Sequence, residues 1–284
     1  MKHRTYLRLK LSNVFWSVAF FSSLWTSALF SQQTGSANGA DSSNNAAPLR
    51  VIVNRAFNVG EELSYIVRYG PIVAGSAKMS IPEIVNVNGR PCYHLLWEAW
   101  TNSFFSRFYK VEDKLGSFVD VDGIFTWRYE KQQREGSFRD DRVVDFDLER
   151  GLAITTKNSK RDTVAIPLFV QDVVSAFYYI RTQKLAPGDT VFVDNYDNGK
   201  ILPLKIIVYR REKIKVRAGK FNCLVVEPQM KTPGLYNQKG RLIVHITDDD
   251  RKIPVLTTTE LYIKAFNLGN VVAELEEIKG VEGY

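Results

Sequence analysis

Two of the three histidines and both cysteines are the residues of this 284-residue sequence best suited to metal binding or nucleophilic chemistry. His94 in "CYHLLW" and His245 in "LIVHIT" lie within alternating apolar segments that are typical of strands. No Asp, Glu or Cys stands near either histidine at a spacing typical of zinc sites. The sequence also lacks H-E-x-x-H, G-x-S-x-G and a Gly-rich phosphate loop. We therefore predict half-buried strand histidines, with no metal site and no cofactor.

Acidic side chains are the remaining candidates for catalysis, because a glycoside hydrolase needs two Asp or Glu residues held across a cleft. The candidates, none of them singled out by spacing, are Glu98, Glu112, Asp113, Asp145 and Asp147. The segment "TDDDR" (247–251) could bind calcium through its carboxylates, but it lacks the spaced ligands and the glycine of a calcium loop. A polar turn between strands is the favoured interpretation, and we name no catalytic residue.

The cysteines, Cys92 in "NGRPCY" and Cys223 in "AGKFNC", both follow turns at the starts of predicted strands. In an exported protein they could form a disulfide. That pairing requires the two strands to be neighbours, because the Cα atoms must approach closely. The favoured alternative is that both are small, buried, apolar residues.

Aromatic residues are densest in "HLLWEAWTNSFFSRFY" (94–109). Strand alternation places Trp97 on one face with Leu95 and Ala99, and Trp100 on the other face. Two apolar faces indicate a strand that is covered on both sides, or one whose second side lines a cavity. Trp97 and Trp100 are therefore tentative ligand-binding residues for an apolar or amphiphilic molecule. A core simply filled by aromatic rings is the competing interpretation.

One stretch, "QDVVSAFYYIRTQKLAPGD" (171–189), follows a helical period instead. Asp172 is a candidate N-cap, and Pro187 with Gly188 ends the segment. These features predict one helix near 172–184, about 20 Å long, which would act as a lid or plug on a curved sheet.

The predicted helix carries Phe177, Tyr178 and Arg181, which we add to the tentative ligand-binding residues. Arg181 shares the apolar face of Phe177 one turn away. Its guanidinium could grip an anionic ligand. The favoured alternative is that Arg181 ties the helix to a strand end or loop, because an unpaired buried charge is very costly.

The rest of the chain reads as about a dozen short strands separated by turn residues. Asn88-Gly89, Asp122-Gly123, Arg150-Gly151 and Asn198-Gly199 mark hairpin turns. The prediction is a mainly β fold: an antiparallel curved sheet, half-barrel or sandwich, with one inserted helix. Long parallel crossovers are missing, which disfavours a doubly wound α/β fold.

The N-terminus predicts export. Four basic residues precede the apolar run 14–30, a pattern typical of a signal peptide, and cleavage after Ser31 would suit it. A signal-anchor helix is the alternative. Residues 32–48 are rich in Ser, Asn, Ala and Gly and read as a flexible linker, which leaves 49–284 as a single β-rich domain.

Charge gives little support for nucleic-acid binding. Residues 1–31 hold four of the 38 Lys and Arg and none of the 31 Asp and Glu, so the remainder carries 34 basic against 31 acidic residues. No long basic run remains. After cleavage we expect no transmembrane span. Hydrophobic content of 45% and charged content of 24% are ordinary for a globular protein.

With these features in place, the chain resembles a known family. "FNVGEELSYIVRYGPIVAGSAKMSI" resembles the opening of bacterial envelope proteins grouped as domain of unknown function 3108, and "KVEDKLGSFVDVDGIFTW", "DVVSAFYYIR" and "HITDDDRKIPV" resemble its later stretches. The resemblance spans about 57–279. It implies one exported β-rich domain with an inserted helix, and no reaction. The positions that match are Gly60, Glu61, Tyr65, Gly75, Asp113, Asp172, Arg181, Asp250, Arg251 and Pro254.

Most of these matching positions read as structural. Gly60 and Gly75 suit turns or close backbone approach. Asp172 suits a helix cap. Asp250, Arg251 and Pro254 suit a loop between two strands.

Three functions are consistent with the sequence. The first is a non-enzymatic envelope module, periplasmic, attached to the outer membrane or secreted, that binds a lipid-like molecule or an outer-membrane component. The second is an envelope glycan hydrolase with paired carboxylates. The third is a structural partner that docks by an exposed strand edge. A cavity lined by aromatic residues would favour the first, a carboxylate pair across a cleft the second, and a flat protein with a long free edge the third.

Overall fold

The computed structural model describes residues 50–230, 240–263 and 266–284, so the predicted signal peptide (1–31) and linker (32–48) lie outside the described residues. The first nine strands are β1 Glu62–Tyr69, β2 Ile72–Ser80, β3 Ile84–Val87, β4 Arg90–Thr101, β5 Glu112–Asp120, β6 Thr126–Glu135, β7 Phe138–Asp147, β8 Leu152–Lys157 and β9 Lys160–Ala165. The other six are β10 Thr190–Asp197, β11 Lys200–Val216, β12 Gly219–Met230, β13 Gly240–Thr247, β14 Pro254–Ile263 and β15 Phe266–Lys279. Two helices, α2 Ser103–Ser106 and α3 Val173–Arg181, complete the described part.

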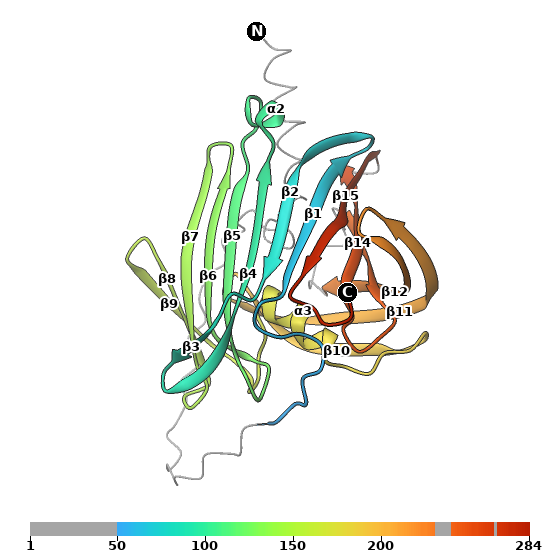
Figure 1. Cartoon of the computed structure of the whole chain (residues 1–284). Helices are drawn as coiled ribbons and strands as arrows, with labels where there is room; N and C mark the ends of the chain where they lie inside the picture. Colours follow the sequence, from blue (N-terminus) through green and yellow to red (C-terminus); the bar gives the residue numbers. More distant parts are fainter. Residues whose placement is uncertain (1–49, 231–239, 264–265) are drawn as a thin grey trace.

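All these strands belong to one antiparallel sheet with the order β10-β11-β12-β13-β14-β15-β1-β2-β4-β5-β6-β7-β8-β9, and β3 pairs with β4 alone. The prediction of a mainly β, antiparallel curved sheet is confirmed. The described residues form one sheet and therefore not a sandwich of two sheets (Figure 1). The two edge strands, β9 and β10, are consecutive in the chain. The connection that carries α3 must therefore pass from one edge of the sheet to the other.

The two ends of the sheet meet through side chains. Tyr196 on β10 forms a hydrogen bond between its hydroxyl and that of Thr155 on β8, and its ring lies 5.4 Å from that of Phe146 on β7. Arg142 on β7 hydrogen-bonds to Asn198 in the β10–β11 turn. No strand pairing joins β9 to β10. We call this side-chain contact between β7–β8 and the β10–β11 hairpin the seam.

Turn chemistry in the sequence explains where the strands reverse. Asn88 and Gly89 between β3 and β4 have φ of 53° and 82°, and Asn198 and Gly199 between β10 and β11 have φ of 49° and 78°. Two consecutive residues with positive φ form the tight hairpin turn that Asn-Gly favours. The two predicted Asn-Gly turns are confirmed.

Helix α3 lies inside the curve of the sheet (Figure 1). Val174 and Tyr178 pack in the larger core cluster, and Ala176 and Ile180 pack in a second cluster with residues of β10–β13. The helix therefore joins the two cores. It ends three residues before the predicted boundary, because the N–H of Thr182 bonds to the carbonyl of Tyr179 and tightens the last turn.

The aromatic segment 94–109 differs from its prediction in two ways. The strand β4 ends at Thr101 and is followed by α2, a four-residue helix capped by Asn102 that the pattern did not indicate. The second face of β4 is also not covered: Trp97 is 6% exposed, whereas Trp100 is 41% exposed. A single sheet has only one side that faces the core, so the outer side of β4 meets solvent.

The cysteines are both buried and unpaired, so the disulfide alternative is wrong. Cys92 lies on β4 and Cys223 on β12, and these strands are not neighbours in the sheet. Burial raises the pKa of each thiol to about 12. Each is an inert, apolar core residue, which was the favoured interpretation.

Gly75 lies where β2 meets the end of β4, and it makes the closest backbone approach in this region. A Cβ atom on Gly75 would lie 2.1 Å from the carbonyl oxygen of Trp100 and 2.9 Å from the Cα of Thr101. Neither atom belongs to a flexible side chain, so the two strands would have to separate.

We expect Gly75→Ala to lower the free energy of unfolding by about 1–3 kcal/mol, the range for overpacking at a tight site. Gly116→Ala on β5 is the matched control, because its Cβ would meet nothing nearer than 3.6 Å. Urea titrations of the two variants measure the difference. Equal stability of the two would contradict the assigned close approach.

Candidate functional site

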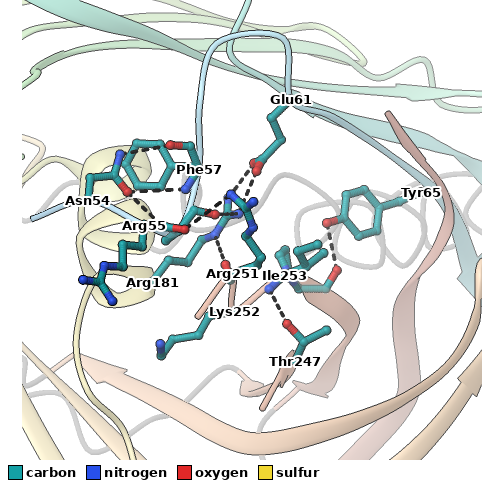
Figure 2. Close-up of polar contacts among 12 residues, drawn as sticks. Asn54, Arg55, Phe57, Glu61, Tyr65, Arg181, Thr247, Arg251, Lys252 and Ile253 are labelled. Atoms are coloured by element: carbon teal, nitrogen blue, oxygen red, sulfur yellow. Dashed lines mark hydrogen bonds and ion pairs between the residues drawn. The ribbon is translucent and has the colours of Figure 1, made fainter. Parts of the chain in front are cut away.

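Arg181, at the end of α3, is buried against the first strand of the sheet (Figure 2). Its Nη1 and Nη2 lie 2.6 and 2.8 Å from the two carboxylate oxygens of Glu61, both residues being 1% exposed. Nη2 also donates to the carbonyl of Ala56 and Nε to that of Arg251. Four of the five N–H groups of the guanidinium thus donate to groups of the protein itself. This geometry corresponds to an arginine that ties the helix to a strand end and to loops.

The surroundings of Arg181 keep it charged. Burial alone would lower its pKa, but the Glu61 carboxylate outweighs burial and raises it. The guanidinium carbon also lies 5.1 Å from the ring centre of Tyr178 and 5.5 Å from that of Phe57. Gly60, with φ of 93°, turns the chain immediately before Glu61.

Asp172 caps α3 from a fully buried position. Its Oδ1 accepts hydrogen bonds from the N–H groups of Val174 and Ser175, and its Oδ2 accepts from the hydroxyls of Ser117 and Thr126. Burial raises its pKa despite these donors. The carboxylate therefore joins the helix start to β5 and β6, as a helix cap and not as a catalytic group.

The loop between β13 and β14 is a turn organised by Asp249. Its Oδ1 accepts from the hydroxyl of Thr247 and from the N–H groups of Arg251 and Lys252. Asp250, which matches the family pattern at this turn, is the neighbour of the carboxylate that organises it. Pro254, at the start of β14, accepts a hydrogen bond on its carbonyl from the hydroxyl of Tyr65. Among the described residues no group of three or more His, Cys, Asp and Glu is placed to hold a metal ion.

The aromatic residues that the sequence singled out are mostly inside the core. Trp97 and Phe177 pack edge to face with ring centres 5.4 Å apart, and Tyr178 packs in the same way on Phe57 at 4.9 Å. Trp100 lies on the outer side of the sheet. The structure therefore brings Trp97, Phe177 and Tyr178 together as packing residues and leaves Trp100 apart from them.

A small recess opens at the seam, with room for about one water molecule. Its lining is amphipathic. Its apolar members are Tyr129, Val144, Val173 and Tyr196, and its polar members are Lys131, Arg142, Asp197 and Asn198. These residues come from β6, β7, the start of α3 and the β10–β11 hairpin, so the recess lies where the two ends of the sheet meet.

Three cations converge on one carboxylate beside this recess. The carboxylate of Asp140 on β7 lies 3.4 Å from Nζ of Lys131 and 2.6 Å from Nζ of Lys157, and it also bonds to Arg142. Burial would raise the pKa of Asp140, but Lys157 and Arg142 outweigh burial and lower it. Burial raises the pKa of Asp197 and lowers that of Lys131. No spacing in the sequence indicates this cluster, because its members lie on three different strands.

Farther along the same inner face, Asp113 on β5 and Glu135 on β6 form a buried carboxyl pair. Burial raises the pKa of both groups, and the charge of Asp113 raises that of Glu135 further. Asp113 Oδ1 also accepts from the N–H of Arg134, and Glu135 Oε1 from Gln133. Burial, followed by the Asp113 charge, raises the pKa of Glu135 to about 8. The two carboxyl groups therefore titrate as a pair, and burial favours a proton on it.

The other candidate carboxylates lie elsewhere. Glu98 forms ion pairs with Lys78 and Lys114, and Asp145 pairs with Arg128. Glu112 pairs with Lys110, and Asp147 accepts from the N–H of Arg150. Of the five candidates, Asp113 alone is buried.

The two strand histidines also stay apart. His94 stacks on Phe118, with ring centres 4.7 Å apart, and lies on β4. His245 is buried on β13, and burial lowers its pKa. Within the described ranges neither belongs to a candidate metal cluster.

Comparisons with known proteins identify a matching family and a solved structure with a similar fold. The model of a family described as "Protein of unknown function (DUF3108)" matches residues 64–270. A β-barrel-like protein of domain of unknown function DUF1849 from Brucella abortus has 9% identity and a TM-score of 0.52, over 82% of this chain and 99% of that chain. At this identity the likeness concerns the fold alone.

A protein from Parabacteroides distasonis described as a "putative lipoprotein" has 12% identity and a TM-score of 0.34, over 81% of this chain and 99% of its own. That score is too low to support an argument. A search of curated proteins found no match.

The buried ion pair between Arg181 and Glu61 contributes to stability because neither charge can be removed alone without leaving the other unpaired. We expect Arg181→Ala to lower the free energy of unfolding by about 3–5 kcal/mol, because Glu61 would remain buried without a counter-charge. Arg210→Ala, which removes an exposed pair with Glu212, should change it by less than about 1 kcal/mol. Thermal and urea unfolding measure both.

The double variant Glu61→Leu with Arg181→Met should recover much of the loss, since no unpaired charge remains. A double variant as unstable as Arg181→Ala would contradict this account of the pair.

The carboxyl pair predicts a dependence of stability on pH. A carboxyl whose pKa is raised in the folded state binds its proton more tightly there, so folding is favoured most at low pH. The free energy of unfolding should therefore fall as the pH rises from about 4.5 to about 8. Glu135→Gln should make this fall smaller, as measured by urea unfolding across that range. Glu112→Gln, on an exposed neighbour, is the control, and a fall unchanged by Glu135→Gln would contradict the assignment.

Proposed function

This chain belongs to the DUF3108 family of proteins of unknown function, and we propose that it is a non-enzymatic binding module of the cell envelope. Its proposed ligand is an anionic amphiphile, held in the recess at the seam. The observation that carries this proposal is the convergence of Lys131, Arg142 and Lys157 on the single carboxylate of Asp140, beside the apolar residues of the recess.

Charge supports an anionic head group. Three cations around one carboxylate leave positive charge that Asp140 alone does not balance. Among the residues that line the recess, Asp197 is the acidic one. A phosphate or carboxylate that entered the recess could take charge-assisted hydrogen bonds from Lys131 and Arg142.

The apolar residues of the recess suit an apolar chain. Tyr129, Val144, Val173 and Tyr196 present rings and branched side chains to the recess. Sites for small amphiphiles combine such residues with a few well-placed polar groups.

Entry requires the seam to widen, since the recess has room for about one water molecule. The contacts across it are side-chain contacts, such as the hydroxyl bond between Thr155 and Tyr196, and no ladder of backbone bonds joins β9 to β10. Side chains can change rotamer at far smaller cost than a strand pair can be broken. The seam is thus the part of the sheet best suited to open for a ligand.

The proposed location rests on the N-terminal sequence, whose basic residues and apolar run are typical of export. We propose a periplasmic or outer-membrane-associated protein. Among the described residues, no helix has the length and apolar character needed to cross a membrane.

A glycan hydrolase is the second candidate, favoured by one observation: the pKa of Glu135, raised to about 8, is suitable for a general acid. Asp113 and Glu135 are both buried, however, whereas a glycosidase holds its carboxyl groups across an open cleft that admits the sugar. The binding module therefore remains the preferred proposal.

The test is native mass spectrometry of the protein purified from its own cell envelope, with organic extraction of bound molecules. We expect an extractable anionic amphiphile, and Lys131→Met should reduce the bound fraction by about tenfold, the loss of roughly one charged hydrogen bond. Lys114→Met, the same change on the half-exposed outer face of β5, is the control.

A mass without ligand, together with no binding of added anionic amphiphiles, would contradict the proposal. Scaffolding would then be the leading alternative, and Asp113→Asn would test the hydrolase.

A further inference from the structure

The loop from β4 to β5, residues 102–111, carries large apolar side chains on its outside. Phe104 is 58% exposed and Phe108 is 63% exposed, and the short helix α2 buries none of its residues. The two rings pack on each other with centres 5.5 Å apart. Exposed apolar groups gathered on one protrusion, as opposed to single scattered ones, mark an interaction surface.

This loop is held in a defined shape by its own polar groups. Asn102 accepts a hydrogen bond on its side chain from the N–H of Phe105. The hydroxyls of Thr101 and Ser106 bond to each other, and the Thr101 hydroxyl accepts from the N–H of Val111. The polar groups thus brace the loop while the rings face outward, so the exposure of Phe104 and Phe108 is built into the fold.

Two neighbouring turns extend the apolar surface. The side chain of Asn102 donates to the carbonyl of Val73 in β2, and the N–H of Gly136 in the β6–β7 turn donates to the carbonyl of Lys110. Figure 1 shows α2 and the tips of these hairpins at one end of the sheet. We define the aromatic rim by its exposed members, which are Ile72, Trp100, Phe104, Phe108 and Phe138.

The charged residues interleaved with the rim are mainly basic. Arg107, Lys110 and Arg139 are exposed. Glu112, the exposed acidic residue at the start of β5, lies 2.7 Å from Lys110 as an ion pair. Protruding rings flanked by cations match the two layers of an anionic lipid surface, because rings can enter the acyl boundary while cations stay at the phosphates.

We propose that the aromatic rim docks the protein on an anionic lipid bilayer, with Phe104 and Phe108 inserted and Arg107, Lys110 and Arg139 at the phosphates. A protein partner would need a hollow shaped to this protrusion, whereas a bilayer deforms around it. The surface is separate from the recess at the seam, so this inference goes beyond the proposed ligand site.

The test is flotation of the exported, purified protein with phosphatidylcholine vesicles that contain or lack phosphatidylglycerol. We expect binding to the anionic vesicles, weaker binding to the neutral ones, and a decrease with added salt. The double variant Phe104→Ser with Phe108→Ser should reduce binding by at least about tenfold, since each ring loses most of its transfer free energy.

Phe192→Ser is the matched control, because Phe192 is 62% exposed but lies on β10. It should bind vesicles like the parent protein. All variants share the same N-terminal residues, so any effect of that segment cancels in the comparison. Blue-shifted tryptophan emission on vesicle binding, reduced in Trp100→Phe, would place the rim itself at the lipid.

Three results would overturn the proposal. One is unchanged vesicle binding by the double Phe variant, and another is equal binding to neutral and anionic vesicles. The third is a dimer of the parent protein that becomes monomeric in the double variant without any vesicle binding, which would assign the rim to a second copy of the chain. Lys131→Met should leave vesicle binding intact, which separates this test from that of the ligand site.

Discussion

The buried pair between Arg181 and Glu61 fixes the position of α3, and the position of α3 determines how the sheet curves. The segment that contains α3 has to connect opposite edges of the sheet, β9 and β10, which a flat sheet would hold far apart. Arg181 binds the end of the helix to the start of β1, in the middle of the strand order, while Asp172 binds its beginning to β5 and β6. With both ends of the helix anchored, the sheet wraps around it and the seam closes.

The inner face of the sheet changes from apolar to polar side chains along its strands. On β6 the inward residues run from Tyr129 through Lys131 and Gln133 to Glu135, all of them buried. The apolar end packs toward α3, and the polar end holds the carboxyl pair under the β6–β7 turn. Burying ions is unfavourable unless partners are supplied, and here the partners are other side chains of the same face. Apolar residues of similar volume would often be at least as stable in these positions.

Local features of the sequence predicted the local features of the structure. Asn88-Gly89 and Asn198-Gly199 form tight turns because the preference for positive φ belongs to the residues themselves. Asp172 likewise caps the helix, whose helical period is visible in the residues that follow it. Alternation could not say which face of β4 is covered, since that depends on strands elsewhere in the sheet, and Trp100 is exposed for this reason.

The candidate site was harder to predict than the fold. Arg181 and Glu61 are 120 residues apart in the chain, and nothing in either segment indicates the other. The carboxyl pair and the cations around Asp140 arise only when β5, β6, β7 and β8 lie side by side. In the sequence these charged residues look like any others, because only their burial in the folded protein distinguishes them. The helix α2 was missed because four residues are too few to show a period.

The pairing of β1 with β15 has a consequence for the order of assembly. Glu62, in the first strand, lies opposite Lys279, in the last, so the contact that joins the two halves of the sheet spans nearly the whole described chain. Each half, β1–β9 and β10–β15, is a succession of neighbouring strands that can form from local contacts. The joint between them cannot form until the ribosome has made the final strand. A chain delivered across a membrane from its N-terminus would therefore arrive with β1 still lacking one neighbour, and its fold becomes complete only when its C-terminus follows.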